Sequence, residues 1–156
     1  MAYQFKAVTA DDLGLLRDLI IGLAQFEQRP EDVTVTEAQL ATALDPKHGH
    51  CHACLLFSSE QPSEAIGFAF YYFTFATFSG SKGLHIEDFF IASQSRGQGA
   101  GKALFHHLRR IALDAGCQNM NWQVLSWNQS AIDFYQSMGG KQHIEHLNFD
   151  YGFSDL

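Results

Sequence analysis

The fold is decided by the stretch Ile86-Glu87-Asp88-Phe89-Phe90-Ile91, followed after four residues by Arg96-Gly97-Gln98-Gly99-Ala100-Gly101. The first part is strand-like. Apolar residues then recur at helical spacing until Gly116, which is placed to end a helix. A strand, a glycine loop and a helix start bring backbone N–H groups and the positive end of a helix dipole together. The stretch therefore predicts an anion site, although alone it could be a tight turn that needs positive φ.

Two common nucleotide loops do not fit these glycines. The dinucleotide pattern G-x-G-x-x-G is not matched, and no first strand of a parallel doubly wound unit precedes the loop at the N-terminus. The triphosphate loop would place a lysine and a hydroxyl after its second glycine, whereas Gly101-Lys102 is followed by Ala103. Both nucleotide classes are therefore excluded.

Outward from this stretch, the pattern alternates strands and helices. Turn residues are expected at 61–64 and 79–83, and helix caps at Thr36 with Gln39 and at Asn128 or Ser130. Strands are predicted at residues 3–8, 51–58, 65–75, 84–91, 120–127 and 146–153, and helices at residues 12–26 and 37–44, after the glycine loop, and from the Asn128 cap to Gly139. We expect one alternating α/β domain with a mixed sheet over residues 1–156.

The composition limits the class of protein. Hydrophobic residues make up 46% and charged residues 17%, which is typical of a chain that buries a core, and no apolar stretch is long enough for a bilayer. Residues 1–8 are too short and too alternating for a secretory signal, so we expect a soluble cytoplasmic protein. The net charge of -7 argues against nucleic acid and anionic membrane as partners.

The cysteines and histidines suggest neither a disulfide framework nor a metal site. Cys51, Cys54 and Cys117 are few and odd in number, so all three are expected to be thiols. Alternation would put His50, His52 and Cys54 on one side of a strand, with atoms able to bind a metal. Because no C-x-x-C or H-x-x-x-H partner exists elsewhere, we expect no metal.

Over its whole length the chain resembles the GCN5-related N-acetyltransferase (GNAT) superfamily. The loop at residues 96–101 matches the R-x-x-G-x-G pattern of that superfamily without a gap. Together with residues 66–74, 86–90 and 127–135 it is similar, in order, to the spermidine/spermine or diamine acetyltransferase branch. The resemblance implies a single-domain GNAT fold, in which about four helices flank a central, mostly antiparallel, twisted mixed β-sheet.

The same resemblance implies acetyl-CoA as co-substrate. The strand at residues 89–91 would run along the pantetheine arm, and the N–H groups of residues 97–102 would hold the pyrophosphate. The Arg96 side chain could equally be a solvated surface charge. The expected cofactor-binding residues are Phe89, Phe90, Ile91, Arg96, Gly97, Gln98, Gly99, Ala100, Gly101, Lys102, Asn128 and Tyr135.

Two catalytic residues are expected by resemblance, Tyr135 and Glu87. Tyr135 would face the CoA sulfur as general acid, although its spacing alone favours packing with Phe134. A primary ammonium, with a pKa of about 10, must lose a proton before it attacks, so Glu87 is expected to act as base, directly or through a water. Asp88 would point to the opposite face if the strand is regular, and both carboxylates could instead be edge or capping groups.

The acceptor side is expected to include Phe26, Glu27, Glu87 and Asp88. Residues 75–78 lack the acidic residue and the tryptophan typical of the polyamine branch, and residues 136–138 replace its basic stretch. The expected acceptor is therefore a primary amine of a small polyamine, diamine or lysine-like molecule. By resemblance alone, the enzyme is expected to be a homodimer. The alternatives are a non-catalytic acyl-CoA-binding module and an acetyltransferase that acts on protein amines.

Overall fold

A computed structural model describes residues 2–153 of the 156-residue chain. The chain forms two compact units, Met1–Gln123 and Val124–Leu156. The first unit holds the sheet and three helices, and the second holds one helix and a long C-terminal segment.

The first unit is built around a five-stranded sheet with the order β1-β2-β3-β4-β5. All neighbouring strands are antiparallel except β4 and β5, which are parallel. This arrangement confirms the expected mixed, mostly antiparallel sheet. The elements are β1 (Tyr3–Ala7), α1 (Leu13–Phe26), α2 (Glu37–Ala43), β2 (Cys51–Ser58), β3 (Gln61–Ala76), β4 (Ser81–Ile91), α3 (Ala100–Asp114) and β5 (Asn119–Trp122), with short 3-10 turns at Ala10–Asp12, Pro30–Asp32 and Ser93–Ser95.

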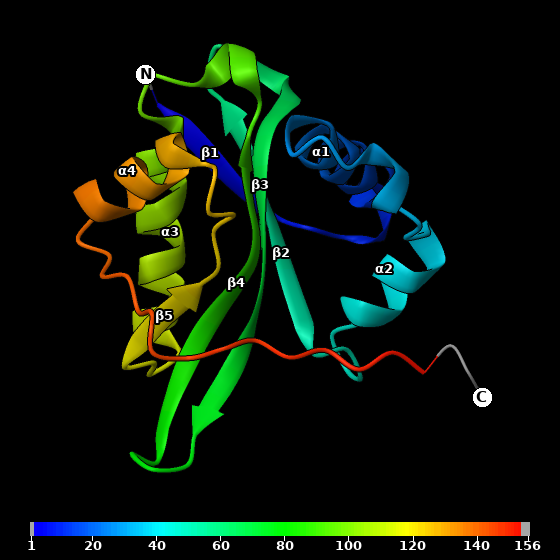
Figure 1. Cartoon of the computed structure of the whole chain (residues 1–156). Helices are drawn as coiled ribbons and strands as arrows, with labels where there is room; N and C mark the ends of the chain where they lie inside the picture. Colours follow the sequence, from blue (N-terminus) through cyan, green and yellow to red (C-terminus); the bar gives the residue numbers. More distant parts are fainter. Residues whose placement is uncertain (1, 154–156) are drawn as a thin grey trace. The chain divides into compact units, whose positions relative to one another are not determined.

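Helices cover both faces of this sheet, with α1 and α2 on one face and α3 on the other (Figure 1). On the first face, Leu16 of α1 packs in one cluster with Phe68 of β3 and Phe90 of β4. On the second face, Leu104 of α3 belongs to a cluster with Ile86 of β4. Burial of these apolar side chains on both faces is what holds the helices to the sheet.

The helix starts follow the capping residues seen in the sequence. The Thr36 side chain accepts from the Gln39 N–H at 3.2 Å, and the Gln39 amide oxygen accepts from the Thr36 N–H at 2.9 Å. Thr9 and Asp12 form a second capping box before α1. Each box satisfies backbone donors that the first turn of a helix leaves open.

Three predicted boundaries were wrong. Residues 61–64 begin β3 rather than forming a turn, because the β2–β3 register shifts between Leu56 and Ser58, and an irregular ladder accepts Pro62, which has no N–H to donate. Residues 81–83, expected in a loop, already pair with β3. The strand predicted at residues 120–127 ends at Trp122, and residues 125–128 form a turn in which the Asn128 N–H donates to the Leu125 carbonyl.

The second unit contains α4 (Gln129–Ser137), and Asn128 is its N-cap, one of the two caps that the sequence offered. No strand exists within residues 146–153, so the strand predicted there was wrong. The alternating Leu147, Phe149, Tyr151 and Phe153 are 75–90% exposed. Alternation permits a strand but does not supply the neighbouring strand whose hydrogen bonds would hold it.

Candidate active site

The glycine loop has the backbone form that an anion site requires. Gly97 and Gly99 have φ of 74° and 90°, and among the described residues no heavy atom lies within 4 Å of the position of an added Cβ on either. Gly99 is the N-cap of α3, and Ala103 is the residue whose N–H donates to the Gly99 carbonyl, at 3.0 Å. The N–H groups of the first helical turn, before Ala103, therefore face the loop with no intrahelical acceptor.

The loop is tied to the first strand by a long-range hydrogen bond. The Tyr3 phenol donates to the carbonyl of Gln98 at 2.7 Å. Donation to the carbonyl leaves the Gln98 N–H uninvolved in this bond. Sequence reasoning did not find Tyr3, because the two residues are 95 positions apart in the sequence and no local pattern joins them.

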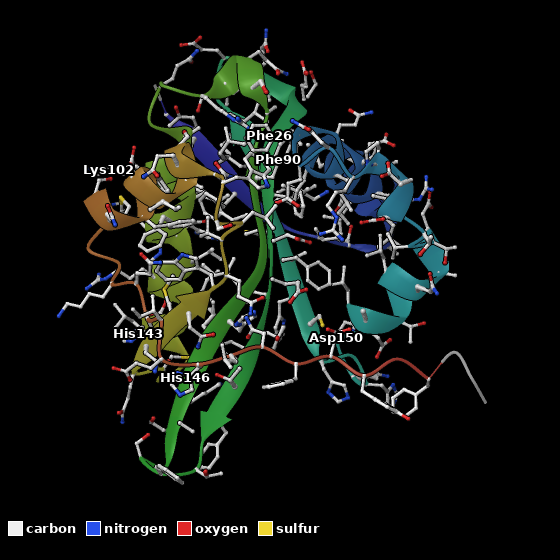
Figure 2. The ribbon with its side chains drawn as sticks, viewed as in Figure 1. Phe26, Phe90, Lys102, His143, His146 and Asp150 are labelled. Carbon is white, nitrogen blue, oxygen red and sulfur yellow. The ribbon has the colours of Figure 1, made fainter. Side chains whose placement is uncertain are left out.

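Arg96 is not simply a solvated surface charge. Its Nε donates to the carbonyl of Ile91 at 2.8 Å, and its guanidinium lies over the ring of Phe26, with 4.1 Å from Cζ to the ring centroid. The ring of Phe90 lies 5.8 Å away. Partial burial lowers the pKa of Arg96. Arg96 thus joins the glycine loop, the end of β4 and the end of α1, where Figure 2 shows Phe26 beside Phe90.

A β-bulge in β4 determines where the carboxylates lie. Phe70 of β3 pairs with Asp88 and Tyr71 pairs with Ile86, so Glu87 is an extra residue between the two pairs. Strand β4 is therefore not regular here, and the condition for Asp88 to point away from Glu87 does not hold. Asp88 shares the α1 face of the sheet with its partner Phe70, which packs in the α1 cluster.

Asp88 is the titratable group that this environment changes most clearly. It is largely buried, and burial raises its pKa from 3.8 to about 6, with further contributions from the negative charges of Glu87 and Glu27. Glu27 is the C-cap residue of α1. The bulge of β4 and the end of α1 thus bring Glu27, Glu87 and Asp88 together in one acidic cluster.

A row of polar side chains crosses four strands beside this cluster. Cys51 of β2 pairs with Tyr72 of β3, Tyr72 pairs with His85 of β4, and His85 pairs with Asn121 of β5. His85 Nδ1 contacts Asn121 Oδ1, and its Nε2 lies 3.7 Å from Glu87 Oε2. The His85 ring thus lies between Asn121 and Glu87, with Nδ1 turned toward the amide and Nε2 toward the carboxylate.

Sequence reasoning missed His85, although its position two residues before Glu87 was a usable signal for a shared strand face. The raised pKa of Tyr72 has burial as its first cause and the charge of Glu87 as its second. The raised pKa of Cys51 has the same two causes in the same order. The row therefore forms one electrostatic environment with the acidic cluster.

Two of the predicted site residues, Asn128 and Tyr135, lie in the second unit. The Asn128 Oδ1 accepts from the Ala131 N–H at 3.2 Å, so this side chain caps α4. The rings of Tyr135 and Phe134 contact each other edge-on, with centroids 5.1 Å apart. Burial raises the pKa of Tyr135, which keeps its phenol protonated at neutral pH.

The side chains of the predicted donor-side residues differ in burial. Phe90 and Ile91 are buried in the two core clusters, and Phe89 packs against the cluster on the α3 face. Lys102, labelled in Figure 2, is exposed on the first turn of α3. The apolar side chains at the end of β4 are therefore held by core packing.

The described residues hold no group of three or more His, Cys, Asp or Glu side chains arranged to bind a metal ion. Cys51, Cys54 and Cys117 are free thiols, and Cys117 is buried. In residues 2–153 none of the helices has both the length and the apolar character that crossing a bilayer requires.

The comparison with protein families decides the class of this site. The acetyltransferase (GNAT) family matches residues 16–140, which include the bulge, the glycine loop and α4. The chain belongs to this family. It is an acetyl-CoA-dependent N-acetyltransferase, as the resemblance to the superfamily implied.

Relatives of this acetyltransferase agree. It is 31% identical over 136 residues to the thialysine N-epsilon-acetyltransferase of Caenorhabditis elegans, covering 87% of this chain and 81% of the relative. It is also 31% identical to the spermidine/spermine N(1)-acetyltransferase-like protein 1 of Homo sapiens, over 88% of this chain and 20% of that protein. An integron cassette protein of V. cholerae shares the fold with a TM-score of 0.78 and 25% identity, over 99% of this chain and 94% of its own.

The donor fits the loop of this acetyltransferase. Acetyl-CoA carries a pyrophosphate, and the open N–H groups at the start of α3, next to two glycines with positive φ, offer donors without a side chain in the way.

Proposed function

We propose that this acetyltransferase transfers the acetyl group of acetyl-CoA to a primary amine of a small molecule, a polyamine, diamine or lysine-like compound, by direct attack. The observation that supports this acceptor class is the acidic cluster of Glu27, Glu87 and Asp88. Three neighbouring carboxylates attract ammonium groups. If Glu87 and Asp88 handle the proton of the attacking nitrogen, Glu27 is left to attract a second positive charge on the acceptor.

The donor half of the proposal rests on the loop. Residues 97–102 would hold the pyrophosphate through their N–H groups, and the main chain of residues 89–91 would flank the pantetheine arm. Arg96 would act through its neighbours rather than on the phosphate, because its Nε donates to Ile91. Acetyl-CoA supplies a thioester carbonyl that an amine can attack.

For the proton that must leave the ammonium, we propose that Glu87 and Asp88 work together. Asp88 has a pKa of about 6, so its carboxylate is ionised at neutral pH. Because this pKa is higher than that of an ordinary aspartate, the carboxylate is a stronger base. Glu87, on the exposed bulge, would pass the proton to solvent or take it through a water. Tyr135, protonated at neutral pH, would deliver a proton to the departing sulfur.

The names of the relatives indicate which amines to test. One relative is named a thialysine acetyltransferase and another a spermidine/spermine acetyltransferase-like protein. A third is an L-ornithine N5-acetyltransferase of Arabidopsis thaliana, 33% identical over 75 residues. All of these acceptors carry a second amino group besides the one acetylated. This shared chemistry matches the surplus of carboxylates in the acidic cluster.

A thiol-release assay tests the proposal with acetyl-CoA and a panel of thialysine, ornithine, spermidine, a monoamine of similar length and a lysine-containing peptide. We expect the molecules with two amino groups to turn over fastest. Glu27→Gln should raise KM for them more than for the monoamine, by about tenfold, because it removes an attractive charge. Glu31→Gln, an exposed change outside the cluster, serves as the control.

Two results would contradict the proposal. Binding of acetyl-CoA without thiol release on any panel member would favour the non-catalytic module. Activity on the peptide alone would favour a protein acetyltransferase.

We further propose that residues 1–156 act as one N-acetyltransferase domain, in the cytoplasm, as a homodimer. The three free thiols support a reducing compartment. The exposed Ile144, Leu147, Phe149, Tyr151 and Phe153 form an apolar segment that a second subunit could cover. Sedimentation equilibrium tests this assembly, and a single species of about 17.5 kDa would contradict it.

A further inference from the structure

Arg96 connects the donor loop to the acceptor side of the first unit. It directly precedes Gly97, so its main chain is part of the loop. Its guanidinium stacks on Phe26 at 4.1 Å, and Phe26 is the last residue of α1, directly before Glu27 of the acidic cluster. The Arg96 side chain thus reaches from the glycine loop to the end of α1, next to Glu27 on the proposed amine side.

Arg96 itself is firmly held, whereas the glycines that follow it in the loop are not. On the β4 side, the Nε of Arg96 donates to the Ile91 carbonyl at 2.8 Å, and Ile91 is buried in the core. On the loop side, Gly97 and Gly99 have open space around them. Glycines with open surroundings leave the main chain of the loop many conformations. A bound pyrophosphate would therefore reduce the freedom of this loop more than that of a loop already held by its neighbours.

At the far end, the last turn of α1 closes by main-chain bonds. The Glu27 N–H donates to the Leu23 carbonyl at 2.9 Å and the Arg29 N–H donates to the Ala24 carbonyl at 2.8 Å. Gln28, between them, has a φ of 60°, which is costly for a residue other than glycine. A helix end that contains such a residue opens more easily, and the Arg96–Phe26 stack opposes that opening.

We propose that Arg96 is a positioning residue that couples the two substrates: a CoA molecule on the loop steadies Arg96, and Arg96 through Phe26 steadies Glu27 for the amine. The proposal rests on the proposed binding of CoA by the loop. Such coupling is reciprocal, so the amine would also tighten CoA binding. A cation–π contact of this kind gives an effect of about 3- to 30-fold.

Hydrogen exchange with CoA as the probe tests this without any acceptor. In the wild type, saturating CoA should slow exchange of the Glu27 and Arg29 amides by about 3- to 30-fold. In Arg96→Met this slowing should disappear, although CoA still binds through main-chain groups. Phe26→Leu removes the same contact from the other side, so one variant remains informative if the other misfolds.

The matched control is Lys82→Met. Lys82 makes the same type of contact with Phe73, at 3.9 Å, near the start of β4. Its loss should leave the CoA-dependent slowing intact. With the best panel amine, Arg96→Met should raise KM for the amine about 3- to 30-fold and change kcat little. The double variant with Phe26→Leu should lose no more than either single variant.

The outcomes separate this inference from the proposed function. If calorimetry detects no CoA binding to the wild type, the proposed function fails and the coupling fails with it. If CoA binds but the α1 amides exchange at an unchanged rate, or slow equally in Arg96→Met, the coupling is refuted while the proposed function stands.

Discussion

Replacing Asp88 by asparagine should stabilise this enzyme while it removes activity. The carboxyl lies largely buried beside two other carboxylates, and its pKa rises from 3.8 to about 6. A raised pKa means that the folded state holds the proton more tightly than the unfolded state. Stability therefore falls as pH rises from about 4 to about 6, and the full cost is present at neutral pH. Asparagine keeps the shape and carries no charge.

The expected gain follows from the size of the pKa change. The distance from 3.8 to about 6, at about 1.4 kcal/mol for each pH unit, corresponds to about 3 kcal/mol at pH 7.5. At pH 4.5 the folded carboxyl is already protonated and the unfolded one mostly is not, so about 1 kcal/mol remains. For a chain of this length, 3 kcal/mol raises Tm by about 6–12 °C.

Urea unfolding of Asp88→Asn and wild type at pH 4.5 and 7.5, without ligands, measures this difference. Asp18→Asn, which changes an exposed carboxylate on α1, is the control and should shift stability by less than about 0.5 kcal/mol. The thiol-release rate of Asp88→Asn should fall by about 100-fold or more. A variant that is destabilised at pH 7.5, or whose gain is the same at both pH values, would refute the electrostatic account of the acidic cluster.

Three further changes test the loop, the acid and the core. Gly99→Ala, at φ 90°, should cost about 1–2 kcal/mol of stability and weaken acetyl-CoA binding, measured by calorimetry, about tenfold. The control is Gly80→Ala, at φ 62° in the β3–β4 turn, which should cost similar stability and leave acetyl-CoA binding unchanged. Tyr135→Phe should lower turnover by about 100-fold with acetyl-CoA affinity within about twofold, and full thiol-release activity would remove Tyr135 as the acid. Leu16→Ala, at a fully buried position, should cost about 3–5 kcal/mol in urea unfolding, whereas Leu113→Ala, at 55% exposure, should cost less than about 1; equal costs would contradict the assigned core.

The local sequence determined the glycine loop and most helix starts. The Thr36–Gln39 capping box and the Asn128 cap depend on residues within one helical turn, so spacing in the sequence is also spacing in space. Gly97 and Gly99 adopt positive φ, as a loop of this composition predicts. The alternating residues 146–153 show the limit of such patterns, because a strand also needs a partner that its own sequence does not supply.

Only the tertiary structure decided how the acceptor side is arranged. Alternation places Glu87 and Asp88 on opposite faces, but the bulge opposite Phe70 and Tyr71 cancels that rule. The end of α1 adds Glu27 to the cluster, and the charge and burial that raise the pKa of Asp88 come from that assembly. The glycine-loop stretch thus indicated an anion site from sequence alone, because its groups belong to one continuous stretch, and acetyl-CoA followed from the resemblance to the superfamily. The acceptor side combines distant stretches that folding brings together.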